Sequence, residues 1–311
     1  MSRMTKTNEN IKVDMLAPEQ QTKKERPAKK AKTAMKTNLQ GKVTKNMVLL
    51  GLLLFAFVIL YPLFWMVVSS FKSYDEIYGN VWGLPSVWHF ENYATAWSMG
   101  ISGYFFNSLF VTITTIVLVV IIGSMAAFTL SRYKSRWIDV ALIFTIGGIM
   151  MNPQVALIPL FELLTWLDLI NTHWALILTY VAYRLPLTII LIRAFFLSIP
   201  KELEESAIID GCSEFGIYAR IYLPLSIPII VTTIVLTAYF AWNEFMFATV
   251  FIDSDVLKTI PSGLMNFRDA LRTDWGVLLA GMVIATIPMV VLLVFLQRYL
   301  VRGLSEGSVK G

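Results

Sequence analysis

The sequence is poor in the residues that form disulfides and bind metal ions, with one cysteine and two histidines among 311 residues. Cys212 alone cannot form an internal disulfide, and a single thiol is too few for a cysteine-based zinc or iron–sulfur site. His89 and His173 both fall in predicted loops, which argues against a histidine metal site. We therefore expect no metal site and no cofactor in this chain.

Charged residues are also scarce, at 15% of the chain against about 25% in a typical soluble domain. Hydrophobic residues make up 56%, and the mean hydropathy is +0.64. The sequence has no Gly-rich phosphate loop of the form G-x-x-x-x-G-K-[ST], so we do not expect the chain to bind or hydrolyse ATP itself. This composition indicates a membrane protein rather than a water-soluble enzyme, and we assign no catalytic residue.

Positive charge is concentrated at the N-terminus. Residues 1–45 carry 12 Lys/Arg and 4 Asp/Glu, whereas the remaining residues carry 14 and 17. Because the positive charge is not spread over a foldable domain, the net charge of +5 does not indicate a nucleic-acid-binding protein. We predict that residues 1–46 form a basic, disordered cytoplasmic tail and that residues 47–311 form the membrane domain. The Lys-rich segment 23–32 has two explanations, binding of anionic lipid headgroups or a role in topology alone.

Six apolar runs are long enough to cross a bilayer, which takes about 20 residues of helix each. Backbone groups in lipid must pair within the segment, and none of the runs alternates as a membrane strand would, so we predict six transmembrane helices. Their approximate bounds are Met47–Phe71, Phe105–Leu130, Trp137–Leu160, Thr172–Leu197, Leu225–Phe251 and Trp275–Val301. The first run lies too far from the N-terminus, and is too long, for a signal peptide.

The distribution of Lys and Arg predicts the orientation of these helices. One set of connections and tails holds 21 Lys/Arg, and the alternate set holds 4. Cytoplasmic loops carry the excess of basic residues, so both termini are predicted to be cytoplasmic.

The predicted cytoplasmic segment 198–224 has the pattern of two short helices separated by a stop. Pro200 suits the first helical position, and the glutamates that follow it favour the helix dipole. Gly211 can take a positive φ and end the first helix. Ser213 can cap the second helix, which runs towards Pro224.

The first of these short helices is predicted to be amphipathic. Leu203, Ala207 and Ile208 share one face, whereas Glu202 and Glu205 lie together on another. We expect this helix to project from the membrane and to dock with a partner protein.

The spacing of Glu205-Ser206-Ala207, Gly211 and Ile221–Pro224 resembles the EAA motif of ABC importer permeases. The family usually has alanine where this chain has Ser206, a mild departure. Other segments resemble the carbohydrate-uptake (MalG-like) branch of the family, namely Ser69–Lys72, Glu91–Tyr93, Phe106–Ser108, Trp242–Phe245, Gln297–Gly303 and Gly307–Gly311. The resemblance covers nearly the whole membrane domain and leaves out the basic tail.

The resemblance implies an all-α polytopic fold, the type I ABC importer transmembrane domain, with six transmembrane helices. It implies a multi-pass protein of the cytoplasmic (inner) membrane of a bacterium or archaeon that translocates a sugar, which we predict to be an oligosaccharide. The implied partners are a second homologous permease in a heterodimer, two ATPase subunits, an extracytoplasmic solute-binding protein and the lipid bilayer. ATP and magnesium would be bound by the ATPase subunits.

In such importers the segment 198–224 is the coupling helix region, which sits in a cleft of the ATPase and moves with it. Carried over by position, the resemblance implies that Glu205 contacts the ATPase and that Gly211, which has no Cβ, lets the two backbones approach closely. It also implies that Asp210 fixes the turn and that the small side chain of Ala207 leaves room for the ATPase. The expected coupling residues are Glu205, Ser206, Ala207, Asp210, Gly211, Ile221, Leu223 and Pro224. The alternative is that they only end an interfacial amphipathic helix.

Ionisable and aromatic residues within the spans are candidates for the substrate pathway, because charge is costly in lipid. Arg184 lies about 18 Å along its helix from Thr172, beside Pro186, which can kink a helix. Facing the pathway, Arg184 would favour an anionic sugar, but it could equally contact a partner subunit or a carboxylate. In the fifth span, an amide, a carboxylate and aromatic rings suit sugars, although aromatic residues also form interfacial belts. The expected pathway residues are Tyr183, Arg184, Tyr239, Trp242, Asn243 and Glu244.

Other classes of function fit the sequence less well. A proton- or sodium-coupled carrier would need paired titratable groups at mid-membrane and usually shows internal repeats, neither of which is visible. A membrane scaffold would not need the ordered cytoplasmic motif. Within the importer class, another polar solute such as a sugar phosphate is the alternative substrate. In the third predicted span, Asn152 and Pro153 indicate a helix irregularity.

Overall fold

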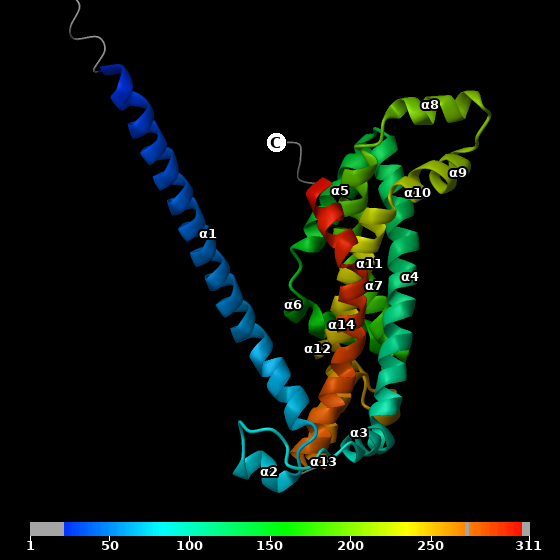
Figure 1. Ribbon diagram of the computed structural model, residues 1–311. Helices are drawn as coiled ribbons and strands as arrows, with labels where there is room; N and C mark the ends of the chain where they lie inside the picture. The colour runs from blue at the N-terminus through cyan, green and yellow to red at the C-terminus, as the bar shows by residue number, and fades with distance from the viewer. Residues whose placement is uncertain (1–21, 271–273, 307–311) are drawn as a thin grey trace, which may run out of the picture. The chain divides into compact units, whose positions relative to one another are not determined.

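The computed structural model describes residues 22–270 and 274–306, and the regular structure of these residues is all helical (Figure 1). The chain divides into two units between Trp65 and Met66. The predicted spans appear as four single helices and two bent helix pairs, so the described residues contain four candidate spans, or six if each bent pair is one span.

The helix α1 comprises Thr22–Ser69, and its residues 44–69 are apolar enough to cross a membrane. The structure differs from the predicted disorder at residues 22–46, which belong to this helix, while residues 1–21 lie outside the described residues. Residues 22–46 are rich in Lys and Ala, which have high helix propensity. They continue a helix that the apolar run already nucleates, and extension adds one hydrogen bond per residue without a new nucleation cost.

In the second unit, three further candidate spans are the segments Glu91–Arg132, His173–Phe196 and Trp275–Arg298. The first comprises α3 (Glu91–Ala96), the π-helical turn η1 (Trp97–Ile101) and α4 (Ser102–Arg132). The other two lie in α7 (His173–Phe196) and α14 (Trp275–Glu306). The helix α7 continues through Pro186 without ending there.

The third predicted span is a bent pair, α5 (Arg136–Ile149) and α6 (Pro153–Trp166), which meet at 106°. The predicted irregularity at Asn152 and Pro153 is confirmed. Asn152 Oδ1 accepts a hydrogen bond from the Gln154 amide at 2.9 Å, which caps α6 and lets Pro153 occupy its first position.

The fifth predicted span, Leu225–Phe251, is also not one helix. The segment Glu214–Leu225 meets α11 (Ile227–Asn243) at 77°, and a separate short helix, α12 (Met246–Phe251), follows. An apolar run indicates the total length of a membrane segment but not where its helix breaks. The break between α11 and α12 is stabilised by the carboxylate of Glu244, which binds the free amides at the start of α12.

The helix α4 packs against α7 and α11, and α11 packs against α14. Within the second unit, α8 (Lys201–Ile209) and α9 (Glu214–Ile217) lie at one end of α4 and α7 (Figure 1). The helices α2 (Tyr74–Gly79), α3 and α13 (Ile260–Ala270) lie at the opposite end. The two ends therefore carry different loop clusters, which hold different candidate site residues.

Candidate functional site

The segment 198–224 folds as two short helical pieces with a sharp turn between them. The helix α8 ends at Ile209, and Gly211 has a φ of +78°, so the predicted stop is confirmed. Pro200 is the N-cap of α8, one position before the first helical position predicted for it. Ser213 caps α9 as predicted, because its Oγ accepts a hydrogen bond from the Gly216 amide at 3.2 Å.

The three residues predicted to share the apolar face of α8 differ in burial. Ala207 is buried, but 45% of Leu203 and 51% of Ile208 are exposed. The carboxylate of Glu204 is held inward by Arg132 and Tyr222, so that Glu204 and Ala207 form the packed face. Leu203 and Ile208 are therefore open to a partner protein, and the docking expected of this helix stays a prediction.

After α9 the chain continues through a π-helical turn, η2 (Tyr218–Tyr222), into α10 (Leu223–Leu225). Their side chains join a buried cluster with residues of α4 and α7. Of the predicted coupling residues in this part, Ile221 and Leu223 are half-buried against that cluster, whereas Pro224 is exposed. The buried members of the cluster are Ala127, Phe128, Ile192, Phe196, Ile199, Ala207, Ile217, Tyr218 and Tyr222.

Polar contacts also hold the segment to α4. Arg132 Nε lies 2.7 Å from Glu204 Oε1, and Tyr222 Oη donates to Glu204 Oε2 at 2.7 Å. Tyr133 Oη donates to Glu214 at 2.7 Å, and this hydrogen bond raises the pKa of Tyr133. In the sequence, Arg132 contributed only to the predicted topology. Its ion pair with Glu204 could not be foreseen, because the two residues are far apart in the chain.

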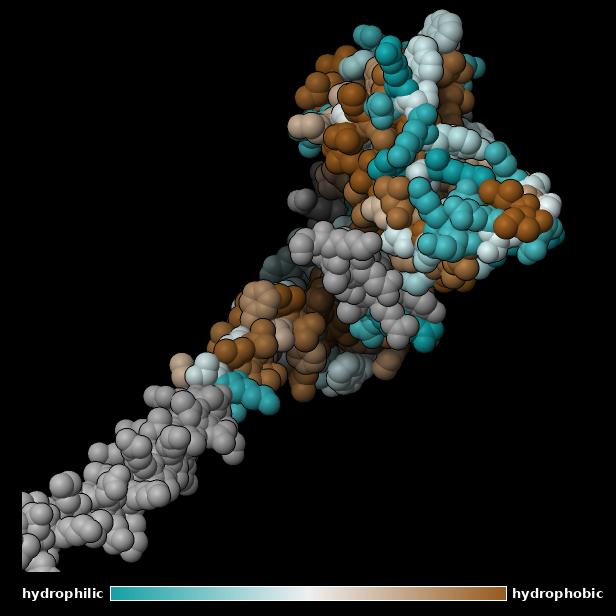
Figure 2. Space-filling view, turned by 90° about the horizontal axis from the view of Figure 1, so that it is seen from above, coloured by the Kyte–Doolittle hydropathy of each residue, from teal (hydrophilic) through white to brown (hydrophobic). Residues whose placement is uncertain are grey.

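Glu205, Ser206, Asp210 and Gly211 are exposed on the turn and on the outer side of α8. Exposed apolar residues accompany them, and Ile209 is the most open, at 85%. Figure 2 shows hydrophobic residues at the tip of this projecting part, with hydrophilic ones around them. The apolar residues exposed here are Leu203, Ile208, Ile209 and Phe215. A mixed apolar and acidic surface on a firmly anchored projection is suited to bind another protein.

Four of the six predicted pathway residues line one cavity of about 570 Å³ beside α11, namely Arg184, Tyr239, Asn243 and Glu244. The guanidinium carbon of Arg184 lies 5.4 Å from the centre of the Phe240 ring. Its Nε is buried without a hydrogen-bond partner among the described residues. Apolar side chains of α7, α11 and the start of α12 complete the wall around these polar groups, namely Leu187, Leu236, Phe240, Phe245 and Met246.

The carboxylate of Glu244 has internal partners. Its Oε1 accepts from the Phe247 amide at 2.8 Å, and its Oε2 accepts from the Ala248 amide at 3.1 Å and from Tyr180 Oη at 2.6 Å. The negative charge therefore lies at the start of α12, where the free amides and the helix dipole favour it. Glu244 joins α12 to α11 and α7, a structural role that its position in an apolar run did not reveal.

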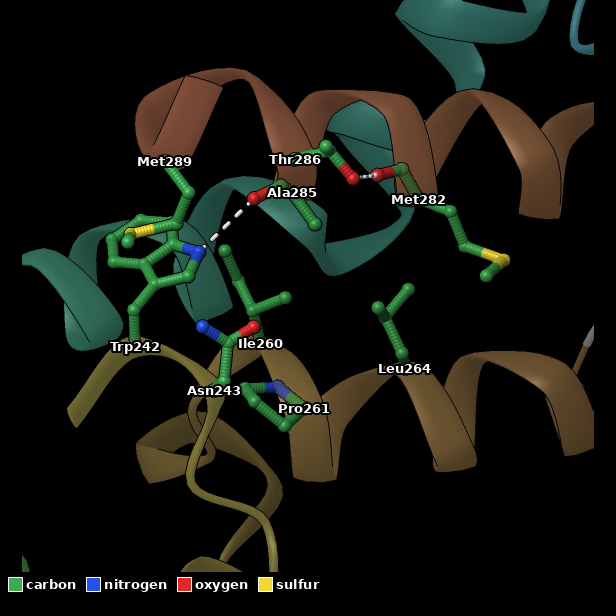
Figure 3. A pocket seen from close by; sticks show the side chains of 9 residues that line it. All are labelled: Trp242, Asn243, Ile260, Pro261, Leu264, Met282, Ala285, Thr286 and Met289. Carbon is green, nitrogen blue, oxygen red and sulfur yellow. Dashed lines mark hydrogen bonds between the residues drawn. The ribbon is translucent and has the colours of Figure 1, made fainter. Parts of the chain in front are cut away.

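The remaining two predicted pathway residues lie elsewhere. Tyr183 packs its ring against Phe247, with centroids 5.4 Å apart. Trp242 is buried on the other side of α11, where its indole donates to the Ala285 carbonyl at 3.0 Å (Figure 3). There it lines a second, mostly apolar pocket with residues of α13 and α14, and Asn243 lines both cavities.

At the opposite end of the second unit, two segments singled out in the sequence come together. Asn92 Nδ2 donates to the carbonyls of Ser70 at 2.9 Å and of Lys72 at 3.1 Å, and Tyr93 Oη lies 2.7 Å from Ser70 Oγ. Lys72 is buried, which lowers its pKa, and its Nζ donates to the Asn80 carbonyl at 2.7 Å. These segments therefore build the end of the bundle.

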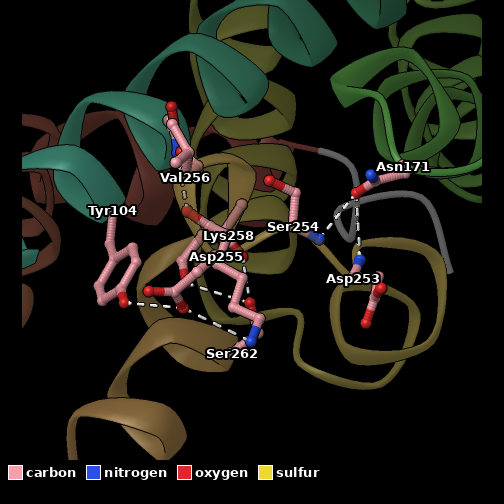
Figure 4. A network of polar contacts seen from close by, with 10 residues as sticks. Tyr104, Asn171, Asp253, Ser254, Asp255, Val256, Lys258 and Ser262 are labelled. Atoms are coloured by element: carbon pink, nitrogen blue, oxygen red, sulfur yellow. Dashed lines mark hydrogen bonds and ion pairs between the residues drawn. The ribbon is translucent and has the colours of Figure 1, made fainter.

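A third such segment, Phe106–Ser108, binds the loop that follows α12. Asn107 Nδ2 donates to the carbonyls of Val256 at 2.7 Å and Lys258 at 2.9 Å. Tyr104 Oη donates to Asp255 at 3.1 Å on the same loop, as Figure 4 shows. Asn171 Oδ1 accepts from the amides of Asp253 and Ser254, so one loop is fixed from two sides. Among the described residues, no group of three or more His, Cys, Asp or Glu side chains could hold a metal ion.

Residues 119–306, which contain α8 and its anchoring contacts as well as the cavity, match the family model described as binding-protein-dependent transport system inner membrane component. The chain belongs to this family. It is the permease of an ABC importer, the membrane-embedded subunit of a system that works with a binding protein, rather than the subunit that hydrolyses ATP.

Among the relatives of this permease is the probable ABC transporter permease protein YurM of Bacillus subtilis, which is 55% identical over 84% of this chain and 87% of its own length. The trehalose/maltose transport system permease protein MalG of Thermococcus litoralis is 34% identical over 88% of this chain and its whole length. A solved structure of a bacterial ABC transporter involved in the import of the acidic polysaccharide alginate matches with a TM-score of 0.71 and 26% identity. The match covers 82% of this chain and 94% of that chain.

Proposed function

We propose that this permease translocates a sugar, most simply an oligosaccharide, across the cytoplasmic membrane of a bacterium or archaeon. In this proposal α5 with α6 counts as one span and α11 with α12 as another, while residues 214–224 stay on the cytoplasmic side, which gives six spans with both termini in the cytoplasm. The excess of Lys and Arg in the alternate connections supports this orientation, in which α8 would lie in the cytoplasm, where ATP is found. The relatives that carry trehalose, maltose or alginate in their names support a saccharide substrate.

The observation that carries the coupling role is the anchored, exposed helix α8. Two of its glutamates and three of its apolar residues face outward, while Glu204, bound to Arg132, and the buried aromatic cluster fix it to α4 and α7. We assign contact with the ATPase to Glu205, Ser206, Asp210 and Gly211. Ala207, Ile221, Leu223 and Pro224 then shape and support the docking surface. Movement of the ATPase would act on α4 and α7 through these contacts.

The proposed assembly is a heterodimer of this permease and a second homologous permease, with two ATPase subunits and an extracytoplasmic solute-binding protein. ATP and magnesium belong to the ATPase subunits, because this chain has no phosphate-binding loop. We assign Arg184, Tyr239, Asn243 and Glu244 to the wall of the substrate pathway. Tyr183 and Trp242 do not line this cavity; in the proposal they stabilise the helices that form it, through Phe247 and the Ala285 carbonyl respectively.

The coupling role can be tested with two charge reversals on different helices. Glu205→Lys changes an exposed residue of the motif on α8, and Glu162→Lys changes an exposed residue of α6, away from the docking surface. In the assembled importer, Glu205→Lys should weaken ATPase retention and abolish ATP-driven uptake, whereas Glu162→Lys should leave both near wild type. Normal transport by Glu205→Lys would refute the coupling role. Uptake that persists without ATP and stops with a protonophore would instead indicate an ion-coupled carrier.

A further inference from the structure

The cavity beside α11 contains a cation that nothing in the described part of the chain neutralises. Arg184 is the one Lys or Arg among its lining residues. Among the described residues, no carboxylate oxygen lies within 4.0 Å of its nitrogens, and its buried Nε has no hydrogen-bond partner. A buried ionic donor without a partner is costly, so a site that keeps one is a candidate for binding a ligand of opposite charge.

The guanidinium has a defined position. Arg184 lies over the Phe240 ring at 5.4 Å, and the two residues come from different helices, α7 and α11. A guanidinium on an aromatic face keeps its charge and its edge donors available for a ligand. The side chain is therefore held towards the cavity without using the donors that recognise an anion.

Glu244 lines the same cavity but does not neutralise Arg184. Three donors already bind its two oxygens: Tyr180 Oη and the amides of Phe247 and Ala248. Those contacts direct the carboxylate to the start of α12. A ligand anion can therefore approach Arg184 without displacing an existing ion pair.

The remaining polar groups of the cavity suit a sugar. Asn243 Nδ2 donates to the Tyr239 carbonyl at 2.8 Å, and no donor among the described residues binds its Oδ1, which can therefore accept from a hydroxyl. Tyr239 is exposed and offers a ring face and a phenol. A neutral sugar could use these two residues, but it would leave the charge of Arg184 unpaired.

The charge count distinguishes a carboxylate from a phosphate. One guanidinium matches one carboxylate, with two parallel hydrogen bonds. A phosphate dianion would leave excess negative charge in a largely apolar cavity that also contains Glu244. We propose that this cavity binds a sugar that carries one carboxylate, with Arg184 as its partner and with Tyr239 and Asn243 against the sugar ring. The proposal rests on the proposed function, since it takes the cavity as part of the substrate pathway.

The test uses the complete importer, with both permeases and the ATPase subunits, in lipid nanodiscs. Equilibrium binding is measured for disaccharides of glucose or galactose type that carry one uronic acid, for their methyl esters and for the matching 6-phosphates. The wild-type complex should bind at least one acid about tenfold or more tightly than its ester and than the phosphate, as expected for one charge-assisted pair. Arg184→Gln should remove this preference, and Arg184→Lys should retain part of it.

The control Arg136→Gln removes the same charge from an exposed position outside the cavity, and it should leave the preference for the acid unchanged. Equal binding of acid and ester by the wild type, binding of the phosphate alone, or no binding of any acid would overturn the proposal. The wild-type comparison decides the matter even if Arg184 variants fail to assemble. If the importer binds neutral sugars without preference for the acid, and ATP still drives uptake, only the carboxylate proposal fails and the proposed importer function is retained. Normal transport by Glu205→Lys would instead refute the coupling role of α8.

Discussion

Arg132, the last residue of α4, lies with its Nε 2.7 Å from Oε1 of Glu204 on α8. Both side chains are largely buried, and Tyr222 donates to the other oxygen of the same carboxylate. Glu204 therefore joins three helical pieces at one point, and α8 cannot move without acting on the end of α4. This contact, together with the packing of Ala207 in the buried cluster, joins the proposed docking surface to candidate membrane spans.

Removing this ion pair should loosen α8 and uncouple transport. Glu204→Gln removes the charge and leaves Arg132 without its carboxylate, at a cost of about 1–3 kcal/mol in unfolding free energy. The loss should be non-additive with Arg132→Gln, because each variant removes the same contact. Thermal unfolding of the purified complex and the ratio of ATP hydrolysed to substrate imported would measure both effects. Fully additive losses would show that the pair contributes nothing.

Gly211 should tolerate asparagine better than alanine. Its φ of +78° is unfavourable for residues with a Cβ, although a Cβ at this position would meet no other atom within 4 Å. We expect Gly211→Ala to cost about 1–2 kcal/mol through backbone strain alone, and Gly211→Asn to cost less. Gly103→Ala is the control, because that glycine lies within α4 and also has open space around it. A stabilising Gly211→Ala would contradict the conformational argument.

Much of this fold could be predicted from the sequence because membrane helices are specified by local composition. Four spans agree with single helices, and the break at Asn152 and Pro153 has a local capping signal. The stop at Gly211 and the cap at Ser213 are equally local. Residues 22–46 belong to α1 in the structure, whereas their polar composition favoured disorder and gave no weight to their helix propensity or to their attachment to an apolar helix.

The contacts at the site that the sequence did not reveal join distant segments. The inward position of Glu204 depends on Arg132, and the structural role of Glu244 depends on Tyr180 and on the free amides of α12. Neither partner could be inferred from helical periodicity. The grouping of Arg184 with Tyr239 and Asn243 likewise depends on how α7 and α11 pack. Sequence reasoning could nominate these residues but could not bring them together.

Gly276 should not accept a side chain. An alanine Cβ there would lie 2.5 Å from the Lys72 carbonyl oxygen and 2.7 Å from Asn92 Nδ2. Since Asn92 bridges the carbonyls of Ser70 and Lys72, the backbone around these residues would have to shift. We expect Gly276→Ala to lower the unfolding free energy by about 1–3 kcal/mol, as for an overpacked core. Limited proteolysis and thermal unfolding would detect this loss, and wild-type behaviour in both would refute the close contact.

Glu244 and Tyr180 should act together as a structural pair, separately from substrate charge. Glu244→Gln retains one oxygen that can accept from an amide of α12, but its NH₂ group faces donors that the second carboxylate oxygen accepts in the wild type. Tyr180→Phe removes one of these donors, the phenol. Each change should lower the unfolding free energy by about 1–2 kcal/mol, and the double variant should lose less than the sum of the two, as thermal unfolding would measure.

Because Glu244→Gln also removes a negative charge from the cavity, affinity for a carboxylate sugar should stay equal or rise. Loss of that affinity in a Glu244→Gln complex that is still folded would show that the carboxylate contacts the substrate instead.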